Sequence, residues 1–231
     1  MRCKKAFLFT GLTAILAALV ISVFRAGSNF MLPLLIGVCG VILIFFTLFE
    51  TRYVQTEKIV LIALLASLSS AGRILFASIP SVQPASFIII MTGIVFGGEM
   101  GFMTGAVCAL VSNLILGQGP WTVWQMFAWG MMGLLSGILS GILRKNRYIC
   151  VAYGILWGFL FGWIMNLWAF TGGLEMTAAS YIAYCITSIP HDAAHAIANA
   201  VLLFALGKQF LKILDRVAVK YGLTTIKTGI R

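Results

Sequence analysis

The residues best suited to chemistry form the string His191-Asp192-Ala193-Ala194-His195, which Asn199 follows. On a helix, His191, His195 and Asn199 would share one face at steps of four, with Asp192 beside them. Two histidines at this spacing can bind one metal ion, as in a metal-dependent enzyme. The general base of an H-E-x-x-H motif is absent, and no third ligand beyond Asp192 is evident. We therefore expect a hydrogen-bonded helix cap or ligand contacts, and we assign no catalytic or metal-binding residue.

A second group of candidate residues follows the turn Gly117-Gln118-Gly119-Pro120. Pro120 suits the start of a helix, where its missing N–H costs nothing. Trp121, Gln125 and Trp129 then recur at steps of four and share one helix face, with Trp124 beside them. An aromatic belt at a membrane surface would explain Trp121. An amide and a third indole running inward on the same face indicate the lining of a binding site equally well.

The other unusual polar residues lie near the predicted outer ends of apolar segments, where each needs an explanation because burial in lipid is costly. Arg73 could pair with Asp192 or face the outer headgroups. We predict an outward-facing ligand site built from the 117–129 turn and helix, the Gln83–Pro84 loop and the outer end of the 191–199 helix. The predicted substrate-binding residues are Arg73, Gln83, Asn113, Gln118, Trp121, Trp124, Gln125, Trp129, His191, His195 and Asn199.

The composition places these side chains in an all-α polytopic membrane protein. Of 231 residues, 61% are hydrophobic and 10% are charged, and the mean hydropathy is +1.04. A soluble domain has about a quarter of its residues charged. The apolar segments are long enough to cross a bilayer as helices. The five cysteines are scattered without a C-x-x-C pair, which indicates small buried apolar residues rather than a metal or redox site.

Helix lengths and charges together predict about eight transmembrane helices. The apolar stretch 85–116 would measure about 48 Å as one helix, against a bilayer core of about 30 Å, so we divide it at Phe96-Gly97-Gly98-Glu99. With that division, fourteen of the 16 basic residues fall on one side, and only Arg25 and Arg73 lie toward the other. The positive-inside rule makes the first side cytoplasmic and places both termini there. The predicted helices are 6–24, 31–49, 59–79, 85–97, 99–116, 120–143, 149–170 and 190–213, with an interfacial helix at 178–186.

Three segments follow from this arrangement. Residues 1–57 form a two-helix membrane extension with a polar linker, 58–214 form a six-helix core, and 215–231 form a basic cytoplasmic tail. Small residues recur at steps of four, and such ridges allow close helix packing, more often within a chain than between subunits. The ridges are Ala63, Ser67 and Ala71; Gly133, Gly137 and Gly141; and Gly154, Gly158 and Gly162.

The chain has no Walker A motif and no G-x-S-x-G motif, so it cannot hydrolyse ATP by a P-loop mechanism. Acidic and basic residues deep in the predicted helices, which proton-coupled carriers need, are almost absent. If this chain moves a solute uphill, the energy must come from a partner.

Specific strings in this chain resemble the substrate-binding S-component of energy-coupling factor (ECF) vitamin transporters. The resemblance covers residues 57–214 and looks most like the cobalamin- and corrinoid-associated group. It rests on Ala71-Gly72-Arg73, Gln83-Pro84, Gly93-Ile94-Val95-Phe96-Gly97, Glu99-Met100-Gly101-Phe102, Val111-Ser112-Asn113, Gly117-Gln118-Gly119-Pro120-Trp121, Trp124-Gln125-Met126 and Ala128-Trp129-Gly130.

The resemblance implies a six-helix core and a role in binding and moving a vitamin or its precursor, such as cobalamin, across the plasma membrane of a bacterium. It implies no enzyme activity or cofactor of its own, and it implies a transmembrane coupling protein and two cytoplasmic ATPases as partners. Family members contact the coupling protein through an Ala-x-x-x-Ala motif on the first core helix. Here Ala63, Ser67 and Ala71 match that spacing, with serine replacing one alanine.

Three functions therefore remain at this stage. The first is an S-component for a corrinoid or for another vitamin or micronutrient. The second is an intramembrane metal-dependent enzyme that uses His191, Asp192 and His195. The third is a structural membrane partner without a ligand. Association with ATPase subunits would support the first, and loss of activity on chelation would support the second.

Overall fold

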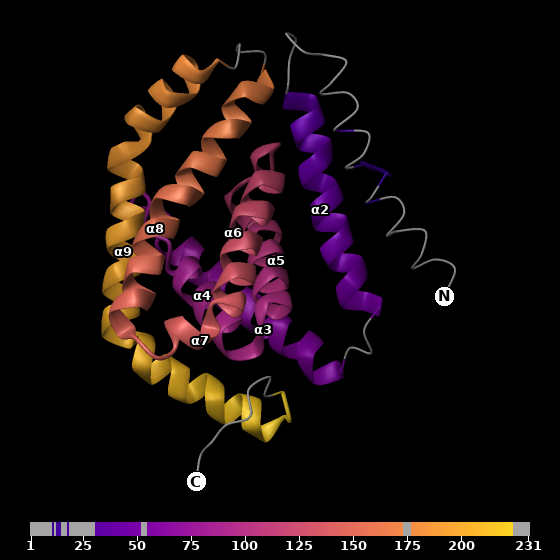
Figure 1. The fold of residues 1–231 in the computed structure, drawn as a ribbon, viewed down its shortest axis with the longest axis vertical. Coiled ribbons are helices and arrows are strands. Elements are labelled where there is room, and N and C mark those ends of the chain that lie inside the picture. The colour runs from indigo at the N-terminus through magenta and orange to yellow at the C-terminus, as the bar shows by residue number, and fades with distance from the viewer. Residues whose placement is uncertain are drawn as a thin grey trace.

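The computed structural model describes residues 11, 13–14, 18, 31–51, 55–172 and 177–223, and these residues are helical apart from short connections. The predicted first helix at 6–24 therefore lies almost entirely outside the described residues. The helices pack side by side around one apolar core (Figure 1). They are α2 (Met31–Thr51), α3 (Thr56–Leu75), α4 (Pro84–Phe96), α5 (Gly98–Leu116), α6 (Trp121–Ile138), α7 (Ser140–Leu143), α8 (Arg147–Asn166) and α9 (Ala178–Lys220), with a 3-10 turn, η1, at Leu167–Gly172.

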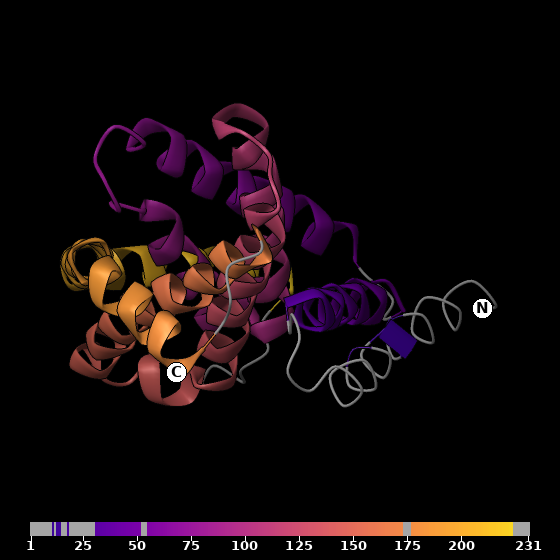
Figure 2. The ribbon, with the colours of Figure 1, turned by 90° about the horizontal axis from the view of Figure 1, so that it is seen from above.

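The short helix α4 occupies the centre of the bundle, where every residue from Ala85 to Phe96 is buried. It packs against α3, α5, α6 and α9. The chain turns sharply after α4 at Gly97, whose φ of 94° and ψ of 165° are open only to glycine without strain. The division at residues 96–99 is therefore confirmed to within one residue. Figure 2 shows α3 reaching away from the other helices before its loop returns to α4.

Two of the three small-residue ridges pack helices inside the chain. A Cβ added at Gly133 or Gly137 would overlap the backbone of α5 at Gly101 or Gly98. A Cβ at Gly158 would likewise overlap the backbone of Ala196 in α9. The pairs α5–α6 and α8–α9 therefore approach closely at these ridges, and this confirms intramolecular packing there.

Helix α9 corrects the prediction that a helix begins at Pro190. It is one continuous helix of 43 residues that begins after Thr177, so the separate helices at 178–186 and 190–213 are joined. Thr177 and Ser180 form a capping box that satisfies the first turn twelve residues before the proline is reached. Pro190 then lies within the helix and removes one backbone donor. Figure 1 shows α9 curving along the outside of the bundle.

Three other boundaries differ from the prediction, one of them because of a side-chain cap. The expected helix 120–143 is interrupted at Leu139, which separates α6 from α7. Helix α8 begins at Arg147 because the Asn146 side chain accepts hydrogen bonds from Tyr148 N and Ile149 N, at 2.9 and 3.3 Å. The polar linker is shorter than 50–58, since α2 continues to Thr51 and α3 begins at Thr56.

Within the described residues, four helical segments are long and apolar enough to cross a membrane: 56–75, 98–116, 147–170 and 178–220. The shorter apolar helices 33–47 and 84–96 accompany them. Helix α2 packs on the core partly through Phe45, whose ring stacks on Phe102 with a centroid distance of 4.0 Å. Together these elements establish an all-helical polytopic membrane protein.

Basic residues gather at the end of the bundle that carries α7 and the last turns of α9 (Figure 1). Arg144 forms an ion pair with Asp215, and Arg147 donates to the carbonyl oxygen of Phe204 while its guanidinium lies 3.4 Å from the centre of that ring. The positive-inside rule predicts that this end faces the cytoplasm.

We predict that a cysteine introduced in place of exposed Lys145 reacts with maleimide only after the membrane is made permeable. The measurement is labelling of intact cells with an impermeant maleimide, in a background without the five native cysteines. Labelling from outside intact cells would reverse the assigned orientation of the whole bundle.

Candidate functional site

A cavity of about 260 Å³ opens between the α3–α4 loop, α8 and α9. Its walls combine one aromatic ring and a thioether with carboxylate, amide, hydroxyl and imidazole groups. Polar side chains predominate in this lining, and such placed polar groups orient a ligand in a small-molecule site. The lining residues are Ser81, Gln83, Phe161, Gly162, Met165, Asn166, Ser188, His191, Asp192 and His195.

Asp192 is the acidic residue of this cavity, and the packing of α8 on α9 holds it in place. The carboxylate lies directly over Gly162, where any Cβ would overlap it. Its Oδ2 accepts a hydrogen bond of 2.8 Å from Ser188, one turn earlier on α9. Ser188 in turn accepts one of 3.0 Å from Asn166 on α8. Glycine at position 162 thus makes room for the carboxylate of Asp192, a residue with only 4% of its surface exposed.

His195 connects the cavity to the centre of the bundle. Its Nε2 lies 2.7 Å from Ser86 Oγ, and Ser86 also accepts a hydrogen bond of 3.0 Å from the indole of Trp129. Phe161 packs edge-on against His195 and in a tilted stack on Trp129, with centroid distances of 5.2 and 4.8 Å. The cavity wall is therefore continuous with the predicted binding helix α6 through Trp129.

Arg73 begins a separate chain of polar contacts across α3, α5 and α6. Its Nη1 donates to Ser112 Oγ at 2.5 Å and to Asn113 Oδ1 at 2.6 Å, and its guanidinium lies 5.0 Å from the centre of the Trp129 ring. Asn113 Nδ2 donates to Thr122 and Gln125, at 2.8 and 2.7 Å. Burying the guanidinium is offset by these bonds and by the aromatic ring. Arg73 thus bonds to Ser112 and Asn113, and no ion pair joins it to Asp192 in the described part of the chain. Its role in substrate binding stays a prediction.

Gln118 completes this chain at the turn before α6. Thr122 donates to Gln118 Oε1 at 2.9 Å, and Gln118 Nε2 donates to the carbonyl oxygen of Leu110 at the same distance. Helix α6 begins at Trp121, directly after Pro120, as predicted. Asn113 therefore bonds to Gln125 directly and is linked to Gln118 through the Thr122 hydroxyl, and these contacts hold the ends of α5 and α6 together.

The structure brings only part of the predicted site to the cavity. Gln83, His191 and His195 line it, and Trp129 reaches it through Ser86. Trp121 packs edge-on against Trp168 at 5.4 Å, and Trp124 is buried with its indole N–H unpaired.

Asn199 and His191 depart from the helix face they were predicted to share with His195. Asn199 is fully buried and donates to the carbonyl oxygen of Gly154 at 3.0 Å. His191 is largely exposed at the cavity rim. The cause is geometric, because steps of four advance by about 400° and drift by about 40° each. How these residues act on a ligand stays a prediction.

Seven residues that line the cavity were not among the predicted substrate-binding residues: Ser81, Phe161, Gly162, Met165, Asn166, Ser188 and Asp192. Ser86, which contacts His195 behind the wall, was not predicted either. The contact of Gly162 with Asp192 could have been predicted from the sequence. Gly162 ends a ridge of small residues, and Asp192 is the only acidic residue of the 178–213 segment. The role of Ser86 could not have been predicted, because a serine in the first turn of an apolar helix usually forms a hydrogen bond with its own backbone.

The metal alternative finds little geometric support. Within the described ranges, no three His, Cys, Asp or Glu side chains gather in a way that could hold a metal ion. His195 is engaged with Ser86, while His191 faces outward at the rim. The histidine pair therefore does not converge on a common point.

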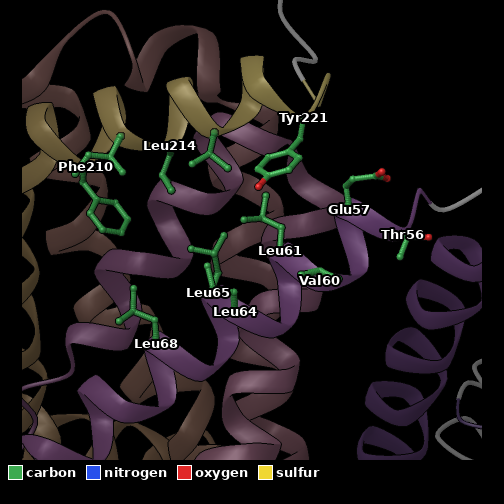
Figure 3. A pocket seen from close by; sticks show the side chains of 12 residues that line it. Thr56, Glu57, Val60, Leu61, Leu64, Leu65, Leu68, Phe210, Leu214 and Tyr221 are labelled. Carbon is green, nitrogen blue, oxygen red and sulfur yellow. The ribbon is translucent and has the colours of Figure 1, made fainter.

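A second feature lies on the free face of α3. Ala63, Ser67 and Ala71 are all exposed, unlike the glycine ridges of α6 and α8. Beside them an apolar groove of about 550 Å³ runs between α3 and the last turns of α9 (Figure 3). Leucines 61, 64, 65 and 68 line it from α3, and Phe210, Leu214 and Tyr221 line it from the other side. This part of α3 is thus free to contact another molecule.

The helical fold defines an integral membrane protein with a polar cavity beside the α3–α4 loop. The family model described as "ECF-type riboflavin transporter, S component" matches residues 53–212, well over half of the 231 residues. The chain belongs to this family of ECF transporter S-components. Members are transport subunits, so the family implies a transporter component rather than an enzyme.

Individual relatives match a shorter part of the chain than the family model does. UPF0397 proteins of Aliivibrio fischeri strain MJ11 and Vibrio atlanticus strain LGP32 are each 28% identical over 98 residues, which is 40% of this chain and 52% or 53% of theirs. The folate transporter FolT of Streptococcus mutans is 25% identical over 105 residues, 44% of this chain and 54% of its own. The chain thus spans about half the length of the curated relatives it matches. No solved structure matches it at a significant level.

Proposed function

We propose that this chain is the substrate-binding and translocation subunit of an ECF-type importer for a vitamin or vitamin precursor. The observation that carries the proposal is the cavity of about 260 Å³ formed by the α3–α4 loop, α8 and α9. It lies within the segment that matches the family, and it presents a carboxylate, amides and an aromatic wall. These groups suit recognition of a polar ring compound.

The partners we propose are a transmembrane coupling protein and two cytoplasmic ATPases, since the chain has no P-loop of its own. The exposed ridge of Ala63, Ser67 and Ala71 and the adjoining groove are the proposed contact for the coupling protein. Small residues let a partner helix approach closely in lipid, and the leucines beside them supply apolar contact. The protein would act in a bacterial plasma membrane with both termini cytoplasmic.

The cavity favours a compact vitamin over a corrinoid. Sites for drug-sized ligands measure about 300–1,000 Å³, and cobalamin is far larger than such ligands. The family description names riboflavin and one relative is named for folate. Cobalamin remains a second candidate because of the amide-rich end of α5 and α6, although Asn113, Gln118 and Gln125 are already hydrogen-bonded there.

We expect the purified protein in nanodiscs to bind at least one of riboflavin, folate and cyanocobalamin with a Kd of about 1 µM or tighter, close to −8 kcal/mol. Isothermal titration calorimetry with each vitamin provides the measurement. Affinity purification from the native membrane should also recover two ATPase subunits and a coupling protein. Absence of binding to all three, together with absence of these subunits, would overturn the transport proposal.

A further inference from the structure

Two hydrogen-bond acceptors in the cavity lack partners. The buried Oε1 of Gln83 accepts no hydrogen bond, and only Oδ2 of Asp192 is engaged, by Ser188. Among the described residues, no donor forms a hydrogen bond with Gln83 Oε1 or with Asp192 Oδ1. Leaving buried acceptors unpaired is costly, most of all for a carboxylate, unless a ligand supplies the missing donors.

The surroundings of Asp192 fix its carboxylate as an acceptor. Ser188 accepts from Asn166 Nδ2, and its own hydroxyl can donate to Asp192 at 2.8 Å, the shorter of its two acceptor distances. No arginine or lysine pairs with Asp192 among the described residues. His191, the nearest basic side chain in sequence, is exposed at the rim. The carboxylate is thus held over Gly162, with Oδ1 against that glycine and without a donor from the described residues, while Oδ2 keeps one acceptor site beside its bond from Ser188.

We propose that Asp192 recognises two adjacent N–H donors on the edge of an aminopyrimidine-type ring, such as the ring NH and exocyclic amino group of a 2-amino-4-oxopteridine. A carboxylate matches two parallel donors in the bidentate manner it uses with guanidinium groups. Gln83 Oε1 accepts a further donor from the same ligand. This inference rests on the proposed function and names the class of substrate for that cavity.

The same geometry disfavours an imide edge. In a flavin or a lumazine, the ring NH lies between two carbonyl oxygens, so a carboxylate would gain one hydrogen bond and face at least one oxygen. A site built around a hydrogen-bond pattern strongly rejects analogues that leave its buried groups unpaired. Asp192 therefore selects between two ring classes of nearly identical size and shape.

The rest of the cavity fits a flat bicyclic ring. Phe161 and Met165 supply apolar contact from α8, and the His195 ring stands edge-on to Phe161 at 5.2 Å. The volume of about 260 Å³ holds a fused bicycle but not a ring system with large substituents fully enclosed. A longer side chain of the ligand would extend through the mouth of the cavity.

The test compares pterin with lumazine, which differ only in an amino group against a carbonyl oxygen at one ring carbon. Calorimetry on the full chain in nanodiscs should give pterin at least about thirtyfold tighter binding than lumazine. In Asp192→Asn, which keeps the shape but offers one donor and one acceptor, this preference should fall to threefold or less. Asp215→Asn, a matched change on the same helix at the Arg144 ion pair, should retain the full preference.

Equal or tighter binding of lumazine or riboflavin by the wild type would overturn the inference, as would an intact preference in Asp192→Asn. No detectable binding of either pteridine would overturn it as well. Thermal unfolding followed by tryptophan fluorescence verifies that each variant is folded, and Gln83→Leu supplies a second variant, in which pterin affinity should fall. Binding of riboflavin alone, with the ATPases recovered, would leave the transport proposal intact while rejecting the aminopyrimidine class.

Discussion

Replacing Gly133 with alanine is expected to lower the free energy of unfolding by about 3 kcal/mol. The new Cβ would overlap the carbonyl group of Gly101 in the facing helix, where both partners are backbone. A side chain could rotate away from such a clash, but a helix backbone can only move as a unit, so α5 and α6 must separate. Overpacking in a close-packed interior costs about 1–3 kcal/mol, and a backbone-to-backbone clash belongs at the upper end.

Gly141→Ala, in the short helix α7 that follows α6, provides the control. Nothing lies within 4 Å of a Cβ at Gly141, so this variant should be neutral or slightly more stable. Alanine is preferred over glycine in a helix by up to about 1 kcal/mol, which gives the two variants opposite expected signs. Thermal unfolding in detergent, followed by tryptophan fluorescence, measures both. Equal melting temperatures for Gly133→Ala and wild type would contradict the close approach of α5 and α6.

The sequence predicted the architecture where local rules dominate. The turn at Gly97 follows from the length of residues 85–116 against the bilayer and from the need for a glycine conformation between two helices. The Gly133 and Gly158 ridges follow from spacing alone, because small residues at steps of four leave a helix face that only another helix can fill. These features depend on few residues and on a strong external constraint, the membrane thickness.

Helix α9 shows where local rules failed. A proline is usually read as a helix start or stop, yet Pro190 lies within α9. The preceding turns are nucleated by the Thr177–Ser180 capping box and anchored by packing, including the hydrogen bond of 2.9 Å from Tyr181 to the Trp163 carbonyl oxygen. Such long-range support is not visible in a single sequence.

The site was predicted as a region more accurately than as a set of side chains. Gln83 and the 191–195 string do meet at one cavity, although the string lies within α9 and not at a helix end. Spacing could not reveal that Gln125 would accept a hydrogen bond from Asn113. Side-chain orientation depends on which neighbouring helix supplies the partner, and Ser86 and Phe161 lie outside the motifs that marked α4 and α8.

Replacing Ser67 with tryptophan is expected to reduce vitamin uptake to less than about a tenth of wild type while leaving ligand binding unchanged. Ser67 is exposed at the middle of the Ala63–Ala71 ridge, beside the groove shown in Figure 3. A large ring there would hold any partner helix away from α3, and loss of one central contact costs about 2 kcal/mol or more, roughly thirtyfold in affinity. The cavity lies on α8, α9 and the α3–α4 loop, so the substitution does not reach it.

Ile197→Trp supplies the matched control, because Ile197 is also exposed, on α9, away from the ridge. This variant should transport normally, since a tryptophan there meets only lipid.

Uptake of radiolabelled vitamin by cells that carry the ATPases and the coupling protein gives the first readout, and recovery of the coupling protein with the tagged chain gives the second. Ser67→Trp should lose both, and Ser67→Ala, which restores the Ala-x-x-x-Ala spacing from Ala63, should retain both. If Ser67→Trp transports and recovers the coupling protein as wild type does, the coupling protein must contact a different face of the bundle.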